Sequence, residues 1–492
     1  MGFDLRLDTP QGRLRGVVEH GVAVFKGIPY AQPPLGERRF QPPVQASAWE
    51  GVRDGTRYGP TAPRTGYPPP FDAMFDEPVI EGDDCLSLNV WTPHPVRARM
   101  SVMVWIHGGA FRNGTSAAPG YDGSAFARSG VVLVSINYRL GVDGFLFLEG
   151  RTPNRGLLDQ VAALEWVRSN IEAFGGDPEN VTVFGQSAGG MSVCALMTMP
   201  SARGLFHRAI AQSGGGHHAL APEDARRVTA AVARAAGVSA DPAGLADADL
   251  GALAQAQGKV SLDVTMNPDP ARWGRLAYDA MPFEPTIDGD VLPALPIETI
   301  EAGISADVPL LTGTTSQEWR LFLVPTRAID AITDLHLQLA LSAYALPADA
   351  WSLYRDRAGS AGERLCDLVT DWFLTVPAIR LAERRPRSPT FVYRFAWSSP
   401  QYDGRLGACH ALELPFVFDT RETRGARALA GPTSPSTLAR AMHDAWVSFA
   451  RTGDPGWEPY ETDRRAVMVF DERSEVRPDP DGDRRAVWDG IR

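Results

Sequence analysis

Hydrophobic residues along this chain form two patterns, which predict buried strands and amphipathic helices. Continuous apolar runs that suit strands buried on both faces occupy residues 102–107 (VMVWIH), 131–138 (VVLVSINY) and 181–184 (VTVF). Strand-like runs return at 309–315 (PLLTGTT) and 391–397 (FVYRFAW). The first 30 residues instead alternate apolar and polar positions between turn signals, which predicts short antiparallel strands.

Segments with helical periodicity lie between the later strand-like runs. Between residues 156 and 174, apolar side chains recur at intervals of three and four residues, and Gly-Gly-Asp-Pro at 175–178 ends the pattern. Strand, helix and strand in this order predict a parallel sheet with crossover helices. Residues 219–280 are alanine-rich and predict inserted helices, whereas 441–492 predicts one amphipathic helix and then a short strand.

These elements together predict the α/β class, with a large central, mostly parallel sheet flanked by helices and carrying helical insertions. A chain of 492 residues that is 44% hydrophobic can bury a large core. The sequence shows no internal repeat and no low-complexity linker, so we expect residues 1–492 to form a single domain.

Residues 31–80 are rich in proline and glycine and predict little regular structure. The stretch from Arg64 to Ile80 (RTGYPPPFDAMFDEPVI) reads as an irregular loop, and loops of this length tend to be functional. We expect it to line the mouth of a binding site, with apolar surface from Tyr67, Phe71, Met74 and Phe75. The alternative is that these side chains pack inward as ordinary core.

Charge and composition narrow the possible partners. The net charge is −11, and basic residues are interspersed with acidic ones, so we expect no nucleic-acid groove. No apolar run approaches the roughly 20 residues of a membrane span, and no signal peptide is visible at the start, so we expect a cytoplasmic protein without membrane association. The four cysteines share no metal-ligand spacing, and we expect no metal, no cofactor and no disulfide.

Small residues interrupt the apolar run at 181–184 around one serine. Residues 185–189 (GQSAG) fit G-x-S-x-G, in which a sharp strand-to-helix turn projects the serine hydroxyl above a sheet. Only small residues tolerate such backbone angles, and the following helix directs its amides at the same place. A plain turn is the alternative, but a predicted strand precedes Ser187 and a helix-forming segment follows it. We therefore interpret Ser187 as a nucleophile and the Ala188 amide as an oxyanion donor.

A second glycine-rich segment follows the strand predicted at 102–107. In IHGGAF (106–111), consecutive glycines let backbone amides approach a ligand oxygen closely, as in the other half of an oxyanion hole. A simple glycine turn is the alternative. Because both motifs directly follow apolar strands, we expect the amides of Gly109 and Ala110 to act together with that of Ala188.

The chain as a whole resembles the type B carboxylesterases, a family that includes bacterial para-nitrobenzyl esterases and is related to cholinesterases. The resemblance rests on ordered segments spread from about residue 3 to residue 470, among them FKGIPYAQPPLGERRF, DDCLSLNVW, VMVWIHGGAF, INYRLG, GLLDQVAALEWVRSNIEAFGGDPENVTVFGQSAGG and HALELPFVF. It implies an α/β-hydrolase fold with a Ser-Glu-His triad in a gorge.

The resemblance places the remaining catalytic roles on two residues. The acid falls on Glu318, just past a predicted strand, and the base falls on His410, in the C-terminal third. The order Ser187, Glu318, His410 agrees with the order expected of this fold. Other histidines lie in early loops, in the oxyanion motif or in helical patterns, whereas His217 and His218 follow a glycine run and remain second choices.

The resemblance also implies supporting interactions. Ion pairs would form between Arg39 and Asp83 and between Arg139 and Asp159. A further serine, Ser213, would lie behind the triad and support it without taking part in the chemistry.

Several positions depart from the family pattern. Gln186 stands where many relatives carry glutamate, and we expect this uncharged residue to disfavour cationic esters. Trp319 and Ala411 stand where the family usually has glycine, and Trp319 could narrow the pocket or reposition Glu318. Cys85 lacks the early-loop cysteine with which it would pair in secreted relatives. Substrate contact is therefore predicted for Gln186, Trp319, Phe71 and Phe75.

The sequence predicts a serine hydrolase that cleaves small to medium, mainly neutral carboxylic esters through an acyl-enzyme, with no cofactor. An amidase, a carbamate hydrolase or an acyltransferase using the same triad is an open alternative, because the pocket selects the leaving group. A catalytically silent binding protein on the same fold is a weaker alternative, since all three triad residues are present. The expected partner is a small-molecule ester, and the chain is expected to be a monomer or a weak homo-oligomer.

Overall fold

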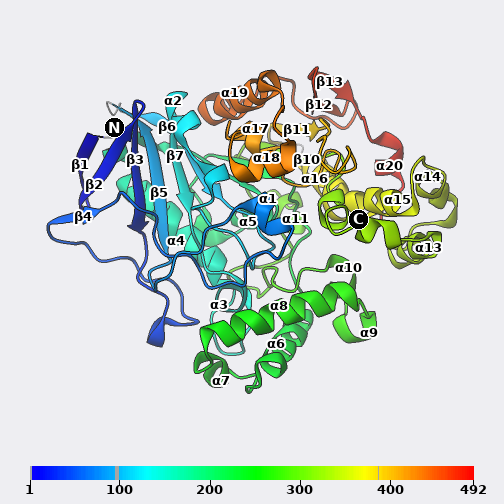
Figure 1. Cartoon of the computed structure of the whole chain (residues 1–492), viewed down its shortest axis with the longest axis horizontal. Coiled ribbons are helices and arrows are strands. Elements are labelled where there is room, and N and C mark those ends of the chain that lie inside the picture. The colour runs from blue at the N-terminus through cyan, green and yellow to red at the C-terminus, as the bar shows by residue number, and fades with distance from the viewer. Residues whose placement is uncertain (1–2, 95–98, 386) are drawn as a thin grey trace.

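One large twisted sheet runs through the protein, shown in Figure 1 as a computed structural model that describes residues 3–94, 99–385 and 387–492. The described residues form a sheet of 13 strands. The strands are β1 (Phe3–Thr9), β2 (Gly12–Glu19), β3 (Val22–Pro29), β4 (Val52–Asp54), β5 (Ser87–Pro93), β6 (Met100–Ile106), β7 (Val132–Ile136), β8 (Gly176–Gln186), β9 (Arg208–Gln212), β10 (Leu310–Thr315), β11 (Thr390–Phe395), β12 (Ala466–Phe470) and β13 (Glu475–Pro478).

The strand order is β1-β2-β3-β5-β7-β6-β8-β9-β10-β11-β12-β13, with β4 pairing beside β2. Neighbours from β7 through β6 and β8 to β12 run parallel, whereas the pairs from β1 to β7 along this order and the β12–β13 pair are antiparallel. The short strand β4 runs parallel to β2. The prediction of N-terminal antiparallel strands and a mostly parallel central sheet is confirmed.

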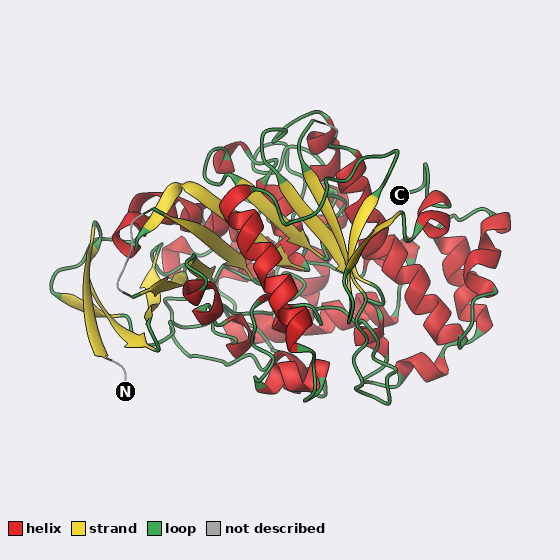
Figure 2. Ribbon diagram, turned by 90° about the horizontal axis from the view of Figure 1, so that it is seen from above, coloured by secondary structure: helices red, strands yellow, loops and turns green. Residues whose placement is uncertain are grey.

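Helices lie on both sides of this sheet, as Figure 2 shows. The first ten α-helices among the described residues are α1 (Phe71–Phe75), α2 (Ser124–Arg128), α3 (Gly141–Phe145), α4 (Arg155–Asn170), α5 (Ala188–Leu196), α6 (Pro222–Ala236), α7 (Pro242–Ala246), α8 (Leu250–Met266), α9 (Pro270–Trp273) and α10 (Leu276–Asp279). The later ones are α11 (Pro296–Glu301), α12 (Arg320–Leu323), α13 (Asp334–Ala343), α14 (Ser352–Arg355), α15 (Ala361–Thr370), α16 (Val376–Glu383), α17 (Leu414–Val417), α18 (Arg424–Ala430), α19 (Ser436–Thr452) and α20 (Gly482–Ala486).

The central strands are apolar on both faces because both faces are covered. In β6, Val104 and Ile106 belong to a core that includes residues of α4, α5 and α6, whereas Met103 and Trp105 belong to a second core that includes residues of α2, α17 and α19. Successive side chains of a strand point to opposite faces. The continuous apolar runs in the sequence therefore mark strands enclosed between two helical layers, as predicted.

The helix predicted over residues 156–174 is confirmed, and its last turn tightens. α4 ends at Asn170 and a 3₁₀ turn continues from Ile171 to Phe174. Gly175 then adopts a left-handed conformation with φ of 83°, which ends the helix and directs the chain into β8. The helices predicted within 219–280 are also present, as α6 to α10.

Two segments differ from their prediction. The stretch from Arg64 to Ile80 is not wholly irregular, because it contains α1, whose Met74 is buried in the second core. At the C-terminal end, α19 begins at Ser436, before the predicted start at 441, and β12 is followed by β13 and α20. α1 has only five residues and packs against the second core through Met74, and local periodicity does not reveal such packing.

One of the two expected ion pairs is confirmed, and the other is wrong. Arg139 donates to both carboxylate oxygens of Asp159, at 2.8 and 2.7 Å, and both side chains are buried. Arg39 instead pairs with Asp143 of α3, at 3.0 Å, whereas Asp83 is exposed. The Asp143 side chain, which is 15% exposed, lies beside the Arg39 guanidinium, whereas the Asp83 carboxylate is solvated.

Within the described ranges, no helix is long and apolar enough to cross a membrane. That residues 1–492 form a single domain stays a prediction; the continuous sheet, whose strands come from both ends of the chain, supports it.

Candidate active site

The residues singled out in the sequence meet at one edge of the sheet. His107 follows β6, Ser187 follows β8, Ser213 follows β9, and Glu318 lies three residues beyond β10. These four strands are parallel neighbours, so their carboxyl ends face the same side. Ligands of open α/β sheets bind at this edge.

Ser187 occupies a strained turn between β8 and α5, with φ of 59° and ψ of −125°. The turn is possible because the neighbouring backbone comes very close: a Cβ atom on Gly189 would lie 2.0 Å from the carbonyl oxygen of Ile106. Glycine at this position therefore permits the close approach of α5 to β6. The Ser187 side chain is partly exposed and makes no hydrogen bond to any described residue.

The glycine-rich segment after β6 lies directly against this turn. A Cβ atom on Gly108 would come within 3.1 Å of the Ser187 Cβ. Gly109 and Ala110 adopt positive φ angles of 116° and 52°, and their backbone amides donate no hydrogen bond to the described part of the chain. Ala188 is the first residue of α5, and amides in the first turn of a helix have no intrahelical acceptor. All three predicted oxyanion donors are thus free to bind an external oxygen.

Glu318 is fully buried and held by three hydrogen bonds. Its Oε1 accepts from the Ser213 hydroxyl at 2.7 Å and from the Thr315 amide at 2.8 Å. Its Oε2 lies 2.6 Å from Nδ1 of His410. Ser213 lies behind the acid, in the supporting position that the sequence suggested.

His410 is oriented by this carboxylate and by the backbone. Its amide donates to the Glu318 carbonyl at 3.1 Å, and its imidazole is only 6% exposed. With Nδ1 donating to Glu318, the other ring nitrogen, Nε2, is left as the acceptor. That nitrogen lies 3.1 Å from the side-chain amide nitrogen of Gln186.

The two alternative histidines have different surroundings. His218 lies 3.2 Å from Glu284 and 3.0 Å from the Phe373 carbonyl, and burial lowers the pKa of its imidazole to about 3. Burial, followed by the charge of Arg492, lowers the pKa of His217 well below its ordinary value. Neither is bonded to Glu318, so the geometry brings His410 and not these residues to the acid.

Trp319 and Ala411 are accommodated without disturbing the acid. Trp319 takes helical angles before α12, donates its amide to the Thr370 hydroxyl at 3.1 Å, and packs on Phe322 and Phe373. Glu318 keeps its three hydrogen bonds. Ala411 takes a φ of 65°, a conformation that glycine adopts more easily.

A buried carboxylate beside the site was missed in the sequence. Glu413 is fully buried and accepts from Gln212 Nε2 at 3.2 Å, and the side-chain oxygen Oε1 of Gln212 accepts from Trp446 Nε1 at 3.0 Å. Burial, followed by the negative charge of Glu318, raises the pKa of Glu413 to about 7. Its place three residues after His410 was the available signal, but a glutamate near a histidine is too common to single out.

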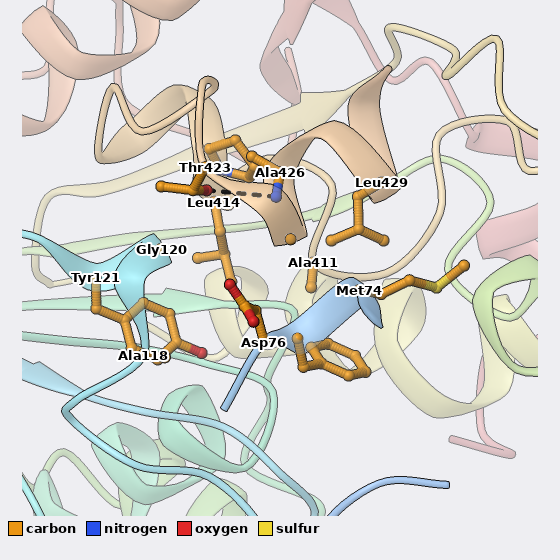
Figure 3. A pocket seen from close by; sticks show the side chains of 13 residues that line it. Met74, Asp76, Ala118, Gly120, Tyr121, Ala411, Leu414, Thr423, Ala426 and Leu429 are labelled. Atoms are coloured by element: carbon orange, nitrogen blue, oxygen red, sulfur yellow. Dashed lines mark hydrogen bonds between the residues drawn. The ribbon is translucent and has the colours of Figure 1, made fainter. Parts of the chain in front are cut away.

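A cavity opens between α1 and α18, and Ala411, the residue after His410, is part of its lining. Figure 3 shows Met74, Asp76, Ala411 and Leu414 around it, with Tyr121 at one side. Phe75 also lines this cavity and stacks on Tyr67, with 4.5 Å between ring centroids; Phe71 and Phe75 both pack against the second core, but Phe71 does not line the cavity. Substrate contact by Phe71, Phe75, Gln186 and Trp319 stays a prediction.

The described residues contain no group of three or more His, Cys, Asp or Glu side chains placed to hold a metal ion. The chemistry that this arrangement can support is nucleophilic: a hydroxyl on a strained turn, an imidazole oriented by a buried carboxylate, and backbone amides without an acceptor among the described residues.

Comparison with known proteins gives a consistent result. A model of the carboxylesterase family matches residues 4–488. The para-nitrobenzyl esterase of Bacillus subtilis (strain 168) is 37% identical, over 97% of each chain. The phenmedipham hydrolase of Pseudarthrobacter oxydans is 36% identical, over 96% of each chain. The solved structure of a PNB esterase superposes with a TM-score of 0.85 at 35% identity, covering 98% of this chain and 99% of the other.

Proposed function

This chain belongs to the carboxylesterase family and is a carboxylic-ester hydrolase, and we propose that Ser187, His410 and Glu318 are its catalytic triad. The observation that carries this assignment is the 2.6 Å contact between Glu318 Oε2 and His410 Nδ1, made beside the strained turn that presents Ser187. Hydrolysis proceeds in two halves through a covalent acyl-enzyme.

In the first half, the Ser187 oxygen attacks the carbonyl carbon of the ester while its proton passes to Nε2 of His410. The Glu318 carboxylate stabilises the resulting imidazolium and keeps the ring in the required tautomer. The tetrahedral intermediate then collapses, and His410 gives its proton to the departing alkoxide oxygen. In the second half, a water molecule takes the place of the alcohol. His410 removes a proton from this water while the water oxygen adds to the acyl carbon. The second tetrahedral intermediate then collapses: the bond to the Ser187 oxygen breaks, His410 returns the proton to that oxygen, and the acid leaves.

The backbone amides of Gly109, Ala110 and Ala188 are proposed to bind the oxyanion of each tetrahedral intermediate. Support comes from the free amides of the first two and from the position of Ala188 at the start of α5. Donors of this kind that are already in place need no reorganisation when charge develops on the carbonyl oxygen.

Small to medium neutral esters are the proposed substrates. The cavity between α1 and α18 is lined mainly by apolar side chains, including those of Met74, Phe75 and Leu414. The side chain that contacts His410 Nε2 is the uncharged amide of Gln186. Such a site offers little to a cationic alcohol beyond Asp76, which lies 3.8 Å from Arg424.

Substitution of the triad tests this proposal. Ser187→Ala should lower kcat on a nitrophenyl ester by about 10⁴-fold or more, as in serine triads generally. His410→Ala should be nearly as damaging, whereas His217→Ala and His218→Ala serve as matched controls that retain most of the activity. Full activity of a well-folded Ser187→Ala protein would refute the nucleophile, and a larger loss in either control would refute the base.

Hydrolysis of a carbamate by the same triad is the second candidate, and a relative that is 36% identical is a phenmedipham hydrolase, so members of the family act on more than nitrobenzyl esters. Parallel assays with a nitrophenyl ester and a nitrophenyl carbamate of matched size compare the acyl and carbamoyl groups directly.

Whether the chain is a monomer or a weak homo-oligomer stays a prediction, which sedimentation velocity would test.

A further inference from the structure

Glu77 is a buried carboxylate in the stretch from Arg64 to Ile80 that the proposed mechanism does not use. Its side chain is 9% exposed, and that of the neighbouring Arg64 is 1% exposed. Arg64 Nε lies 3.5 Å from Glu77 Oε2, and the same guanidinium donates to the Pro78 carbonyl at 2.7 Å. The stretch therefore directs one acidic side chain inward, toward the centre of the molecule.

The inward-facing oxygen reaches the segment that carries the proposed oxyanion donors. Glu77 Oε2 accepts a hydrogen bond from the backbone amide of Gly114 at 3.1 Å. This is the one hydrogen bond that Glu77 makes with a described residue outside its own loop.

Gly114 is packed tightly against the start of that segment. Its φ is 107°, and a Cβ atom there would lie 2.1 Å from Nδ1 of His107 and 2.3 Å from the Gly108 carbonyl oxygen. The turn before it is closed by the Asn113 amide, which donates to the Gly109 carbonyl at 2.8 Å. A shift of Gly114 would therefore be transmitted to Gly108 and Gly109.

Keeping a charge at position 77 is costly. Burial raises the pKa of Glu77 to about 7, although Arg64 and the Gly114 amide both act in the opposite direction. Burial also lowers the pKa of Arg64 and raises that of Tyr67, the other titratable groups of this loop that face Glu77. An apolar residue would avoid this cost, so the contact with Gly114 needs an explanation other than stability.

We infer that Glu77 is a positioning residue for the oxyanion hole: through the Gly114 amide it fixes the turn that aims the amides of Gly109 and Ala110. The inference rests on the proposed function of those amides. It assigns to the loop a role in transition-state binding, in addition to any contact with substrate. A loop that merely covers the fold would affect stability without affecting kcat.

Glu77→Leu tests the inference, because leucine fills a similar volume without accepting a hydrogen bond. Loss of a single oxyanion donor costs about 10²–10³-fold in kcat, and an indirect misplacement should cost about 10- to 100-fold, with KM within about twofold. The affinity for a trifluoromethyl ketone, whose adduct with Ser187 carries the oxyanion, should fall by the same factor as kcat/KM. Wild-type kcat in folded Glu77→Leu protein overturns the inference.

Glu77→Gln provides a graded second variant. Its amide oxygen can still accept from Gly114, but charge-assisted hydrogen bonds are roughly twice as strong as neutral ones. We expect kcat between that of the wild type and that of Glu77→Leu. Should Glu77→Leu fail to fold, Glu77→Gln decides alone: a kcat reduced by about threefold or more at unchanged KM supports the inference, and a wild-type kcat overturns it.

Thr61→Val is the matched control for a loosened loop. The Thr61 hydroxyl closes the base of the same stretch: it accepts from the Ile80 amide at 3.2 Å, donates to the Ile80 carbonyl at 3.3 Å, and makes no hydrogen bond with residues 107–114. It should lower Tm while leaving kcat and inhibitor affinity unchanged. A fall in kcat equal to that of Glu77→Leu would show that general loop stability is responsible, which overturns the inference.

Ser187→Ala separates this inference from the proposed function. If Ser187→Ala is inactive and Glu77→Leu has wild-type kcat, only the role of Glu77 is wrong. If Ser187→Ala keeps its activity, the oxyanion assignment fails with the triad, and the inference falls with both.

Discussion

The side-chain amide of Gln186 lies 3.1 Å from Nε2 of His410, the ring nitrogen that receives the proton of Ser187 in the proposed mechanism. Ser187, the next residue, makes no hydrogen bond to the described part of the chain. In the free enzyme the lone pair of the base is therefore occupied by an amide. Gln186 is uncharged, so introducing a charge at this position is the simplest way to change the substrate specificity of the site.

Gln186→Glu should improve cationic substrates selectively. At an effective dielectric near 20, one charge about 4 Å away is worth up to ~4 kcal/mol before screening and desolvation. We expect kcat/KM for a choline ester to rise by about tenfold relative to the neutral ester of the same acid. The measurement is the ratio of the two kcat/KM values in both proteins, and an unchanged ratio contradicts the prediction.

Asp76→Asn is the control for this experiment, because Asp76 also lines the cavity between α1 and α18. The wild type should turn over choline esters weakly. If it prefers them instead, and Asp76→Asn removes the preference, then Asp76 and not position 186 sets charge selectivity.

Phe75→Ala should change substrate preference, and Phe71→Ala should not. Both side chains, from the same short helix, pack against the second core, but of the two only Phe75 lines the cavity. A pocket contact is worth about tenfold in discrimination between neighbouring acyl lengths. The test compares nitrophenyl esters of rising acyl length alongside Tm. A lowered Tm with unchanged preference in both variants would assign the helix a structural role only.

Stability should depend on pH through Glu413. Burial raises the pKa of this carboxyl from 4.5 to about 7. The folded state then holds the proton more tightly than the unfolded state, so this contribution to stability is complete below about pH 4.5 and is lost as pH rises through 7. Since one pKa unit corresponds to about 1.4 kcal/mol, the loss is up to about 3 kcal/mol.

Glu413→Gln removes this titration and tests its sign. Relative to the wild type, the free energy of unfolding of the variant should become larger, meaning that the variant becomes relatively more stable, as pH rises from 5 to 8. Chemical denaturation at each pH measures it, with Glu37→Gln, at an exposed glutamate, as the control. A difference that is constant with pH, or that runs the other way, would contradict the assignment.

The four cysteines should be unreactive in the native protein. All are free and buried, and burial raises the pKa of Cys85, Cys194 and Cys366 to about 12. A thiol of this kind is almost never a thiolate, which is the reactive form. Titration with a disulfide reagent at pH 8 should find almost no reactive thiol, and four after denaturation without reductant. Finding two would instead indicate a disulfide.

Features that depend on neighbours in sequence could be predicted. The apolar runs located β6, β7 and β8, because strands covered on both faces are apolar throughout. The glycines around Ser187 predicted a strained turn, because only small residues permit that backbone to approach its neighbours. The resemblance then placed Glu318 and His410, and the structure brings them together.

Contacts between distant segments were decided only by the tertiary structure. Gln186 and His410 are in contact although they are 224 residues apart in the sequence. Arg39 pairs with Asp143, whereas Asp83 was the predicted partner. Glu77 gave no signal in the sequence, although its carboxylate reaches Gly114. A run of residues fixes local backbone preferences and which face is apolar. Which polar groups meet depends on how the loops pack once the sheet has formed, because a buried polar group takes whichever partner the packed structure brings within hydrogen-bond distance.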